Sequence, residues 1–330
     1  MDAMNHRITL AKRPVGAVAD DCFAADDVPV PSPGPGEVLV EVTWLSIDPT
    51  IRGWMAYDTY LPAIEIGAPI RSGGLGKVVE SDNDAYPVGS TVFGMTGWQQ
   101  YSVFERGLQI VSDRVPPEAA LSVFGTTGLT AYFGLLDIGR PVAGETVLVS
   151  GAAGATGSVA GQIAKIKGCR VVGLAGSDEK CAWLTDEAGF DAAINYKTDN
   201  VRRAIGQACP DGVDIFFDNV GGEILEAAIG HLALRGRVVM CGAISQYNDE
   251  VPGPGPRNLG MLISKRGRME GFIVLDYLRR APEAIGELSG WVADGRLAYK
   301  TDVVDGLDNA PAALDRLFTG ANTGKVMVRL

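Results

Sequence analysis

The pattern of apolar and polar positions changes about a third of the way along the chain. Up to about residue 120, short apolar runs at Glu37–Val42, Lys77–Glu80 and Gln100–Phe104 are separated by glycine and proline turns. These runs predict a β-rich segment. From about Leu121 onward, short apolar runs alternate with segments of helical periodicity. This alternation predicts a parallel sheet with helices on both faces.

The second part contains enough strands for a complete dinucleotide-binding sheet rather than one half of it. The predicted strands are Thr146–Ser150, Arg170–Ala175, Ala192–Asn195, Val213–Asn219, Arg237–Cys241 and Glu270–Val274. A helix at Ala310–Phe318 and a strand at Gly324–Leu330 follow. We expect this tail to return to the N-terminal β-rich part, which makes that part discontinuous in sequence.

A glycine-rich turn follows the first of these strands. Val147–Val149 is a buried-strand pattern, Gly151, Gly154 and Gly157 come next at three-residue spacing, and a helical apolar face follows. Glycine lets the backbone approach a pyrophosphate, and the helix N-terminus offers free N–H groups. Glycine turns also serve simple close packing, but the strand before and the helix after this one favour dinucleotide binding.

The end of the second predicted strand favours NADP(H) over NAD(H). An NAD site usually places a carboxylate there to bind the ribose hydroxyls. Here the strand ends in Gly176-Ser177, and Lys180 follows closely. A small turn with a nearby cation suits a 2′-phosphate. Tyr196 at the next strand end can flank the adenine or the phosphate, and otherwise it is a half-buried packing residue.

Composition narrows the class of partner. The formal net charge of −11 disfavours nucleic acid and anionic membrane surfaces, because both require a basic footprint. No apolar run is long enough for a transmembrane helix, and the first residues do not form a secretory signal, so a cytoplasmic location is the expectation. The five cysteines are scattered and only two histidines occur. No metal site is therefore expected.

Taken together, these motifs resemble the zinc-free branch of the medium-chain dehydrogenase/reductase superfamily, over essentially the whole chain. Within it the chain looks like the prostaglandin and leukotriene reductases, the plant alkenal double-bond reductases and the bacterial curcumin reductases. The matching segments are Asp48–Gly53, Gly125–Tyr132, Gly151–Gly157, Gly176–Lys180, Asn195–Lys197, Phe217–Gly222, Cys241–Tyr247 and Asn322–Lys325.

The resemblance implies a GroES-like β-rich substrate domain over residues 1–124 and 301–330. It implies a doubly wound Rossmann domain that binds NADP over residues 125–300. It also implies the cofactor-binding residues, which are Gly154, Ala155, Thr156 and Gly157 at the pyrophosphate, Ser177, Lys180 and Tyr196 at the 2′-phosphate, Asn219, Cys241, Gly242, Ala243, Ile244, Ser245 and Tyr247 at the nicotinamide half, Phe272, Ile273 and Val274 at the carboxamide, and Asn322 from the C-terminal tail.

Each of these residues also has a plain structural interpretation. Phe272 and Val274 can be core strand residues, and Asn219 can cap the following helix. Two departures from the relatives matter for the substrate. Thr50 stands where many relatives have tyrosine, and Ser264 stands where several have a tyrosine that reaches the substrate carbonyl. Tyr60 and Tyr247 are the alternative hydrogen-bond donors, so the candidates for this catalytic role are Tyr60, Tyr247 and Ser264.

The resemblance implies an NADPH-dependent, zinc-independent reductase of the carbon–carbon double bond in α,β-unsaturated ketones and aldehydes. A quinone reductase is the alternative enzyme, and a non-catalytic NADPH-binding sensor is the alternative outside catalysis. A homodimer is expected. The proline-rich loop Val251–Pro256 either gates the site, contacts a partner or is an ordinary surface connection.

Overall fold

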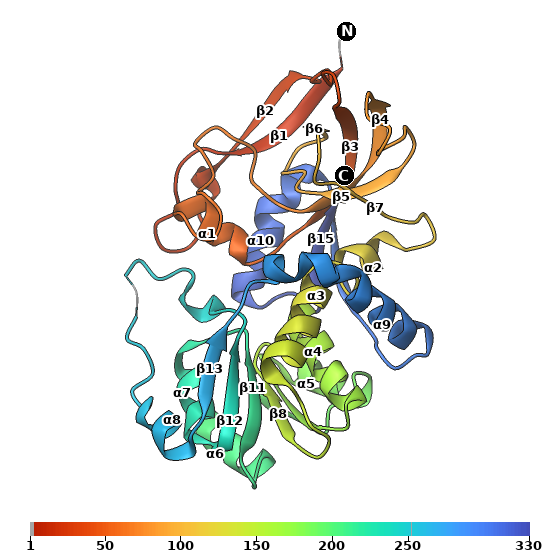
Figure 1. Ribbon diagram of the computed structural model, residues 1–330. Coiled ribbons are helices and arrows are strands. Elements are labelled where there is room, and N and C mark those ends of the chain that lie inside the picture. The colour runs from red at the N-terminus through yellow and green to blue at the C-terminus, as the bar shows by residue number, and fades with distance from the viewer. Residues whose placement is uncertain (1–2, 252) are drawn as a thin grey trace. The chain divides into compact units, whose positions relative to one another are not determined.

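The computed structural model describes residues 3–251 and 253–330, and the described chain divides into two compact units (Figure 1). The first unit holds the N-terminal segment up to Leu121, the short stretch Tyr247–Glu250 and the tail Thr301–Leu330. The second unit holds Ser122–Gln246 and Val251–Lys300. Pro252, within the proline-rich loop Val251–Pro256, lies outside the described residues.

The first unit is built on β-sheets. β1 (Met4–Leu10) and β2 (Phe23–Pro29) form an antiparallel pair. The larger sheet has the order β14-β15-β3-β4-β5-β7, and β6 also pairs with β3. Its strands are β3 (Val38–Ser46), β4 (Gly74–Ser81), β5 (Thr91–Gly94), β6 (Tyr101–Phe104), β7 (Gln109–Ile110), β14 (Thr301–Asp305) and β15 (Lys325–Arg329).

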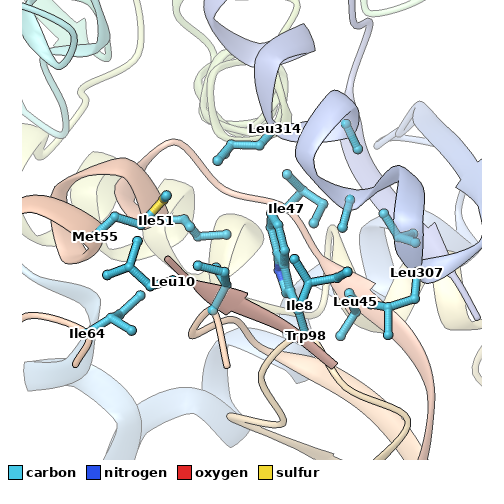
Figure 2. Close-up of a cluster of buried hydrophobic side chains, with 14 of the residues drawn as sticks. Ile8, Leu10, Leu45, Ile47, Ile51, Met55, Ile64, Trp98, Leu307 and Leu314 are labelled. Atoms are coloured by element: carbon cyan, nitrogen blue, oxygen red, sulfur yellow. The ribbon is translucent and has the colours of Figure 1, made fainter. Parts of the chain in front are cut away.

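The C-terminal strand joins the two ends of the chain in one sheet, because β15 pairs antiparallel with β3. Three helices complete the unit, α1 (Thr50–Ala56), α2 (Pro117–Leu121) and α10 (Ala310–Thr319). Figure 2 shows the core in which Leu10, Ile51, Trp98 and Leu314 meet from β1, α1, the segment before β6, and α10. Burying a large aliphatic side chain contributes about 1.5–3 kcal/mol, so this cluster anchors α1 and α10 to the sheets.

The second unit contains a six-stranded parallel sheet in the order β10-β9-β8-β11-β12-β13. Its strands are β8 (Thr146–Val149), β9 (Arg170–Ala175), β10 (Ala192–Asn195), β11 (Val213–Asp218), β12 (Leu232–Met240) and β13 (Arg268–Gly271). The chain reverses its direction of progress across the sheet between β8 and β11. Ligands of such sheets bind at this switch point, beyond the carboxyl ends of the strands.

Helices follow each strand of this sheet and cover its faces (Figure 1). They are α4 (Ala155–Ile166), α5 (Asp178–Asp186), α6 (Val201–Ala208), α7 (Gly222–Gly230) and α8 (Gly260–Lys265), with α3 (Thr126–Phe133) before the sheet and α9 (Ala281–Ala293) after it. The α/β prediction with a doubly wound parallel sheet is confirmed. No helix among the described residues is long and apolar enough to cross a membrane.

One predicted strand is misplaced. The pattern predicts a strand over Glu270–Val274, but β13 ends at Gly271 and a 3-10 helix begins at Val274. The Phe272 ring packs against Gly134, where an added Cβ would lie 2.4 Å from it. Phe272 is apolar because it packs against the segment after α3, and not because it continues the strand.

Candidate cofactor site

The glycine turn lies at the switch point, between β8 and α4. Gly151 adopts a φ of +56°, which favours glycine. A Cβ on Gly157 would lie 2.4 Å from the Gly151 carbonyl oxygen, so only glycine lets the helix start this close to the turn. Gly154 is the N-cap of α4 and supplies no side chain. The first-turn N–H groups at Ala155, Thr156 and Gly157 have no acceptor within the helix and can bind a pyrophosphate.

A buried carboxylate connects the strand ends around this turn. Asp218, the last residue of β11, is fully buried and accepts a hydrogen bond of 2.7 Å from the Ser150 hydroxyl. It also accepts from the backbone N–H groups of Val220 and Gly221, at 3.0 Å each. Burial raises the pKa of Asp218, although these three donors oppose the shift. The carboxylate therefore holds the ends of β8 and β11 in a fixed relation.

Asn219 belongs to the same network. Its backbone N–H donates to the Ser150 hydroxyl at 2.8 Å, and its side-chain amide donates to the Ser150 carbonyl at 2.7 Å. The N-cap of α7 is Gly221, so Asn219 does not cap that helix. Its side-chain oxygen keeps acceptor capacity at the edge of the switch point.

The turn after β12 is hydrogen-bonded to the turn after β11. The N–H groups of Cys241 and Gly242 donate to the Asp218 carbonyl, and that of Ile244 donates to the Asn219 carbonyl. The Ser245 hydroxyl donates to the Val220 carbonyl at 2.6 Å. The structure thus places the turn Cys241–Ser245, including Ala243, beside Asn219.

Cys241 is not a nucleophile in this arrangement. Burial, with the Asp218 carboxylate as a second cause, raises the pKa of its thiol to about 12. A thiol with this pKa is protonated at neutral pH, and only the thiolate is reactive. Its contribution is therefore shape and apolar contact.

The end of β9 offers a small, neutral turn with cations beside it. Ser177 is the N-cap of α5 and accepts from the Lys180 N–H at 3.3 Å. A Cβ on Gly176 would lie 2.7 Å from the Tyr196 hydroxyl and 3.4 Å from Cε of Lys197. Tyr196 and Lys197 therefore lie directly over the turn. Lys197 is a residue that the sequence analysis did not single out, although it stands in the quoted Asn195-Tyr-Lys197 motif.

The nearest carboxylate is already engaged. Asp178 accepts a hydrogen bond of 2.7 Å from the Asn195 side chain. It is therefore held toward β10. A lysine side chain beside a glycine–serine turn, as Lys197 is here, suits the additional phosphate of NADP(H).

The segment that follows β13 lies at the carboxyl edge of the sheet. Phe272 and Ile273 follow the strand directly, and the Ile273 carbonyl accepts from the Asp276 N–H. The Phe272 ring packs edge-on against Tyr277, with ring centroids 6.4 Å apart. Its side chain is a packing residue, so any contact of Phe272, Ile273 or Val274 with a carboxamide would be made by the main chain.

Ser264 does not lie at this edge. It occupies the C-terminal turn of α8, and its hydroxyl approaches the Gly260 carbonyl at 3.5 Å. Gly267, three residues later, packs against the Gly236 carbonyl in the first half of β12, which is the amino-end side of the sheet. This position gives no support to a catalytic role for Ser264, and we leave it out of the proposed site.

The first unit carries the other candidate donor in an exposed loop. The Tyr60 hydroxyl lies 3.2 Å from the Thr50 hydroxyl, and the Tyr60 side chain is 46% exposed. Its ring packs edge-on against Trp54 of α1. Thr50 thus orients the hydroxyl of Tyr60. Tyr247 belongs to the short stretch Tyr247–Glu250 of the same unit.

The segment before Tyr60 is held by a buried ion pair. Nζ of Lys325 donates to Asp48 and to the Ile47 carbonyl, at 2.6 Å each, and Lys325 is 1% exposed. Burial lowers the pKa of Lys325, although Asp48 opposes the shift. Asn322 is also buried, and its amide donates to the Gly324 carbonyl, so it shapes the turn before β15.

Sequence reasoning missed the positioning residues Ser150 and Asp218. A carboxylate at the end of the apolar run Ile215–Phe217, shortly before a Gly-Gly turn, was the available signal. Both faces of such a sheet are covered, so a polar residue in one of its strands is buried and must have hydrogen-bond partners.

Two family models match the chain. One, described as the N-terminal domain of oxidoreductase, matches residues 6–111, and one, described as zinc-binding dehydrogenase, matches residues 155–290. The described residues contain no group of three or more histidine, cysteine or acidic side chains placed to hold a metal ion.

Relatives match over nearly the full length. The chain is 47% identical to YfmJ of Bacillus subtilis, covering 100% of this chain and 99% of that protein. It is 40% identical to the NADPH-dependent curcumin reductase of Escherichia coli, over 99% of this chain and 97% of that one. The chain belongs to the zinc-free branch of the medium-chain dehydrogenase/reductase superfamily.

A solved structure of a family member contains a cofactor. CurA from Vibrio vulnificus, in complex with NADPH, is 39% identical, with a TM-score of 0.94 and 98% of both chains covered.

Lys180 in the first turn of α5 and Lys197 beside Gly176 generate the first prediction. We expect Lys180→Ala and Lys197→Ala each to weaken NADP⁺ binding by on the order of ten- to a hundredfold, because a hydrogen bond to a charged group contributes about 1.5–3 kcal/mol. Binding of NAD⁺, which lacks the 2′-phosphate, should hardly change. Titration calorimetry with both nucleotides measures this difference.

Lys12→Ala, in the first unit, is the control, because it changes the net charge equally and removes a lysine paired with Asp21. Equal weakening of NADP⁺ and NAD⁺ by the two variants would contradict a 2′-phosphate role.

Proposed function

We propose that this protein uses NADPH to reduce the carbon–carbon double bond of α,β-unsaturated ketones and aldehydes. The observation that carries the proposal is the glycine turn at the switch point of the second unit, with the Lys197 side chain over Gly176 at the end of β9. The substrate class is supported by the relative named curcumin reductase, because curcumin is an enone.

The protein is an oxidoreductase with NADP(H) as its cofactor. The residues present fit this cofactor on structural grounds, since the N-cap of α4 is Gly154 and no side chain caps the first-turn N–H groups. The N-terminus of α4 would hold the pyrophosphate, and Ser177, Lys180, Tyr196 and Lys197 would hold the 2′-phosphate end. Asn219 and the Cys241–Ser245 turn would line the nicotinamide half.

When bound, NADPH supplies the hydride that the β-carbon of the enone accepts. Negative charge then develops on the carbonyl oxygen as an enolate. The task of the chain is to orient the substrate and to donate a hydrogen bond to this oxygen. A neutral hydroxyl is sufficient, and Tyr60 is the candidate because its hydroxyl is exposed and is oriented by Thr50.

The second prediction concerns the reaction itself. We expect NADPH to be oxidised in the presence of enones and enals, with saturated ketones and aldehydes as the products, because hydride addition to the β-carbon and protonation of the enolate at the α-carbon by solvent leave the carbonyl intact. Absorbance at 340 nm and product mass measure this on a panel that also contains alcohols and quinones.

Other results of the same panel would contradict the proposal. Turnover of quinones alone would indicate a quinone reductase. Tight NADPH binding without turnover of any panel member would indicate a sensor. Preference for NADH would contradict the cofactor assignment at Lys180 and Lys197.

The third prediction concerns the hydrogen-bond donor. We expect Tyr60→Phe to lower kcat by about 10²–10³, the usual effect of removing one donor to a developing oxyanion. Tyr57→Phe is the matched control, because Tyr57 is an exposed tyrosine three residues away. Tyr247→Phe tests the other candidate. Unchanged turnover in both Tyr60→Phe and Tyr247→Phe would eliminate a tyrosine donor at these positions.

The fourth prediction is the homodimer implied by the family resemblance. β13 is an edge strand of the six-stranded sheet, and Met269, Leu275 and Leu278 near it are 37–43% exposed. An uncovered edge with apolar side chains favours association. Light scattering should give twice the mass of the 34.7 kDa chain. A monomer mass across micromolar concentrations would contradict it.

A further inference from the structure

The second unit has a basic surface pocket that the proposed reaction does not use. Its volume is about 520 Å³, and five arginines line it, Arg140, Arg235, Arg237, Arg266 and Arg268. The one acidic residue in its lining is Glu145. This volume lies within the range of small-molecule sites, about 300–1,000 Å³.

The pocket lies at the amino ends of the parallel strands. Arg268 is the first residue of β13, Arg237 of β12 lies in register beside it, and Glu145 directly precedes β8. The glycine turn follows the opposite, carboxyl end of β8. The pocket is therefore separate from the cofactor residues, with the length of the strands between them.

The backbone at this pocket is unusual. Among the described residues, the non-glycine residues with positive φ are Arg140 (52°), Arg235 (64°) and Arg266 (51°), and all three line the pocket. A side chain with a Cβ is disfavoured in this region. Arg140 and Arg266 are helix C-caps, where glycine is the common residue in this conformation. At a helix C-terminus, the favourable interaction of arginine with the helix dipole offsets part of the steric cost of a positive φ. Arg235 lies within a strand and has no such compensation.

The charges of the pocket are only partly compensated. Arg237 makes two hydrogen bonds to Glu145, at 2.7 and 2.6 Å, and lies in register beside Arg268 across the parallel pair. Nε of Arg268 is buried without a hydrogen-bond partner, and Glu270 is 3.8 Å from its guanidinium. Among the described residues, the guanidinium groups of Arg235 and Arg266 have no partner.

The chain has a net charge of −11, so its overall field repels anions. A cluster of arginines is unusual in such a chain, because mutual repulsion among the guanidinium groups disfavours it. Guanidinium groups bind phosphate oxygens through paired, charge-assisted hydrogen bonds. We propose that this pocket is a second anion site that binds a small molecule carrying a phosphate or pyrophosphate group, independently of NADP(H).

The fifth prediction tests this site with inorganic pyrophosphate, titrated calorimetrically into the full-length protein saturated with NADP⁺. Saturation blocks the cofactor site, so the remaining binding reports on the pocket. We expect one pyrophosphate per chain, with an affinity that falls as salt is raised. The double variant Arg235→Gly/Arg266→Gly should weaken this binding by on the order of tenfold or more, because it removes two charge-assisted contacts.

The double variant Arg235→Gly/Arg266→Gly has a second expected result, which a variant that is merely destabilised would not give. Its thermal midpoint without pyrophosphate should equal or exceed that of the wild type, because glycine accepts a positive φ without a steric cost. The double variant Arg235→Gln/Arg266→Gln keeps the strained backbone and should lose pyrophosphate binding without the gain in midpoint. Arg296→Gln, an exposed arginine outside the pocket, is the control and should bind as the wild type does.

Two results would overturn the proposal. One is the absence of pyrophosphate binding by the NADP⁺-saturated wild type, and the other is unchanged affinity in both double variants. If the wild type binds no pyrophosphate and the variants change the molar mass in light scattering, the arginines serve an interface between copies of the chain instead.

Discussion

The buried carboxylate of Asp218 is the interaction on which the cofactor residues depend. It lies at the end of β11, accepts from Ser150 after β8, and accepts from the N–H groups of the turn before α7. Its own carbonyl accepts from Cys241 and Gly242 after β12. One residue thus determines the relative positions of three strand ends. Burying a carboxylate is unfavourable unless its oxygens are satisfied, and a satisfied network of this kind selects one arrangement.

Cationic side chains lie at both ends of the parallel strands of the second unit. At the carboxyl edge, the Lys197 side chain lies over Gly176 at the end of β9, and the Asp178 carboxylate is hydrogen-bonded to Asn195. At the amino edge, arginines gather around the single carboxylate Glu145. The net charge of −11 describes the chain as a whole, and it does not reveal where cationic side chains are concentrated.

The parallel sheet was predictable because its signals are local. Arg170–Ala175 and Ala192–Asn195 are strands with the predicted bounds, since each is a short apolar run between polar or glycine residues. The strand predicted over Glu270–Val274 was shifted because Phe272 is apolar for a tertiary reason, its contact with Gly134. The strands β1 and β2 were not predicted from the sequence. Apolar and polar residues alternate along them, and their position depends on contacts far along the chain, such as that of Ile8 with Trp98.

The candidate site was predictable to a smaller extent, because hydrogen-bond partners are not visible in a motif. The segment Asp48–Gly53 illustrates the limit. Asp48 is paired with buried Lys325, Ile51 is fully buried, and the Arg52 guanidinium donates to the Gly16 carbonyl at 2.8 Å. These residues hold the segment in place and would be required for any substrate.

Thr50 differs from these neighbours, because its hydroxyl is turned to the exposed Tyr60. A tyrosine at this position, which the family resemblance leads us to expect in many relatives, would present its own hydroxyl, whereas Thr50 contacts that of Tyr60. We propose that the departure from the family pattern at Thr50 changes which residue presents the donor, rather than removing a donor.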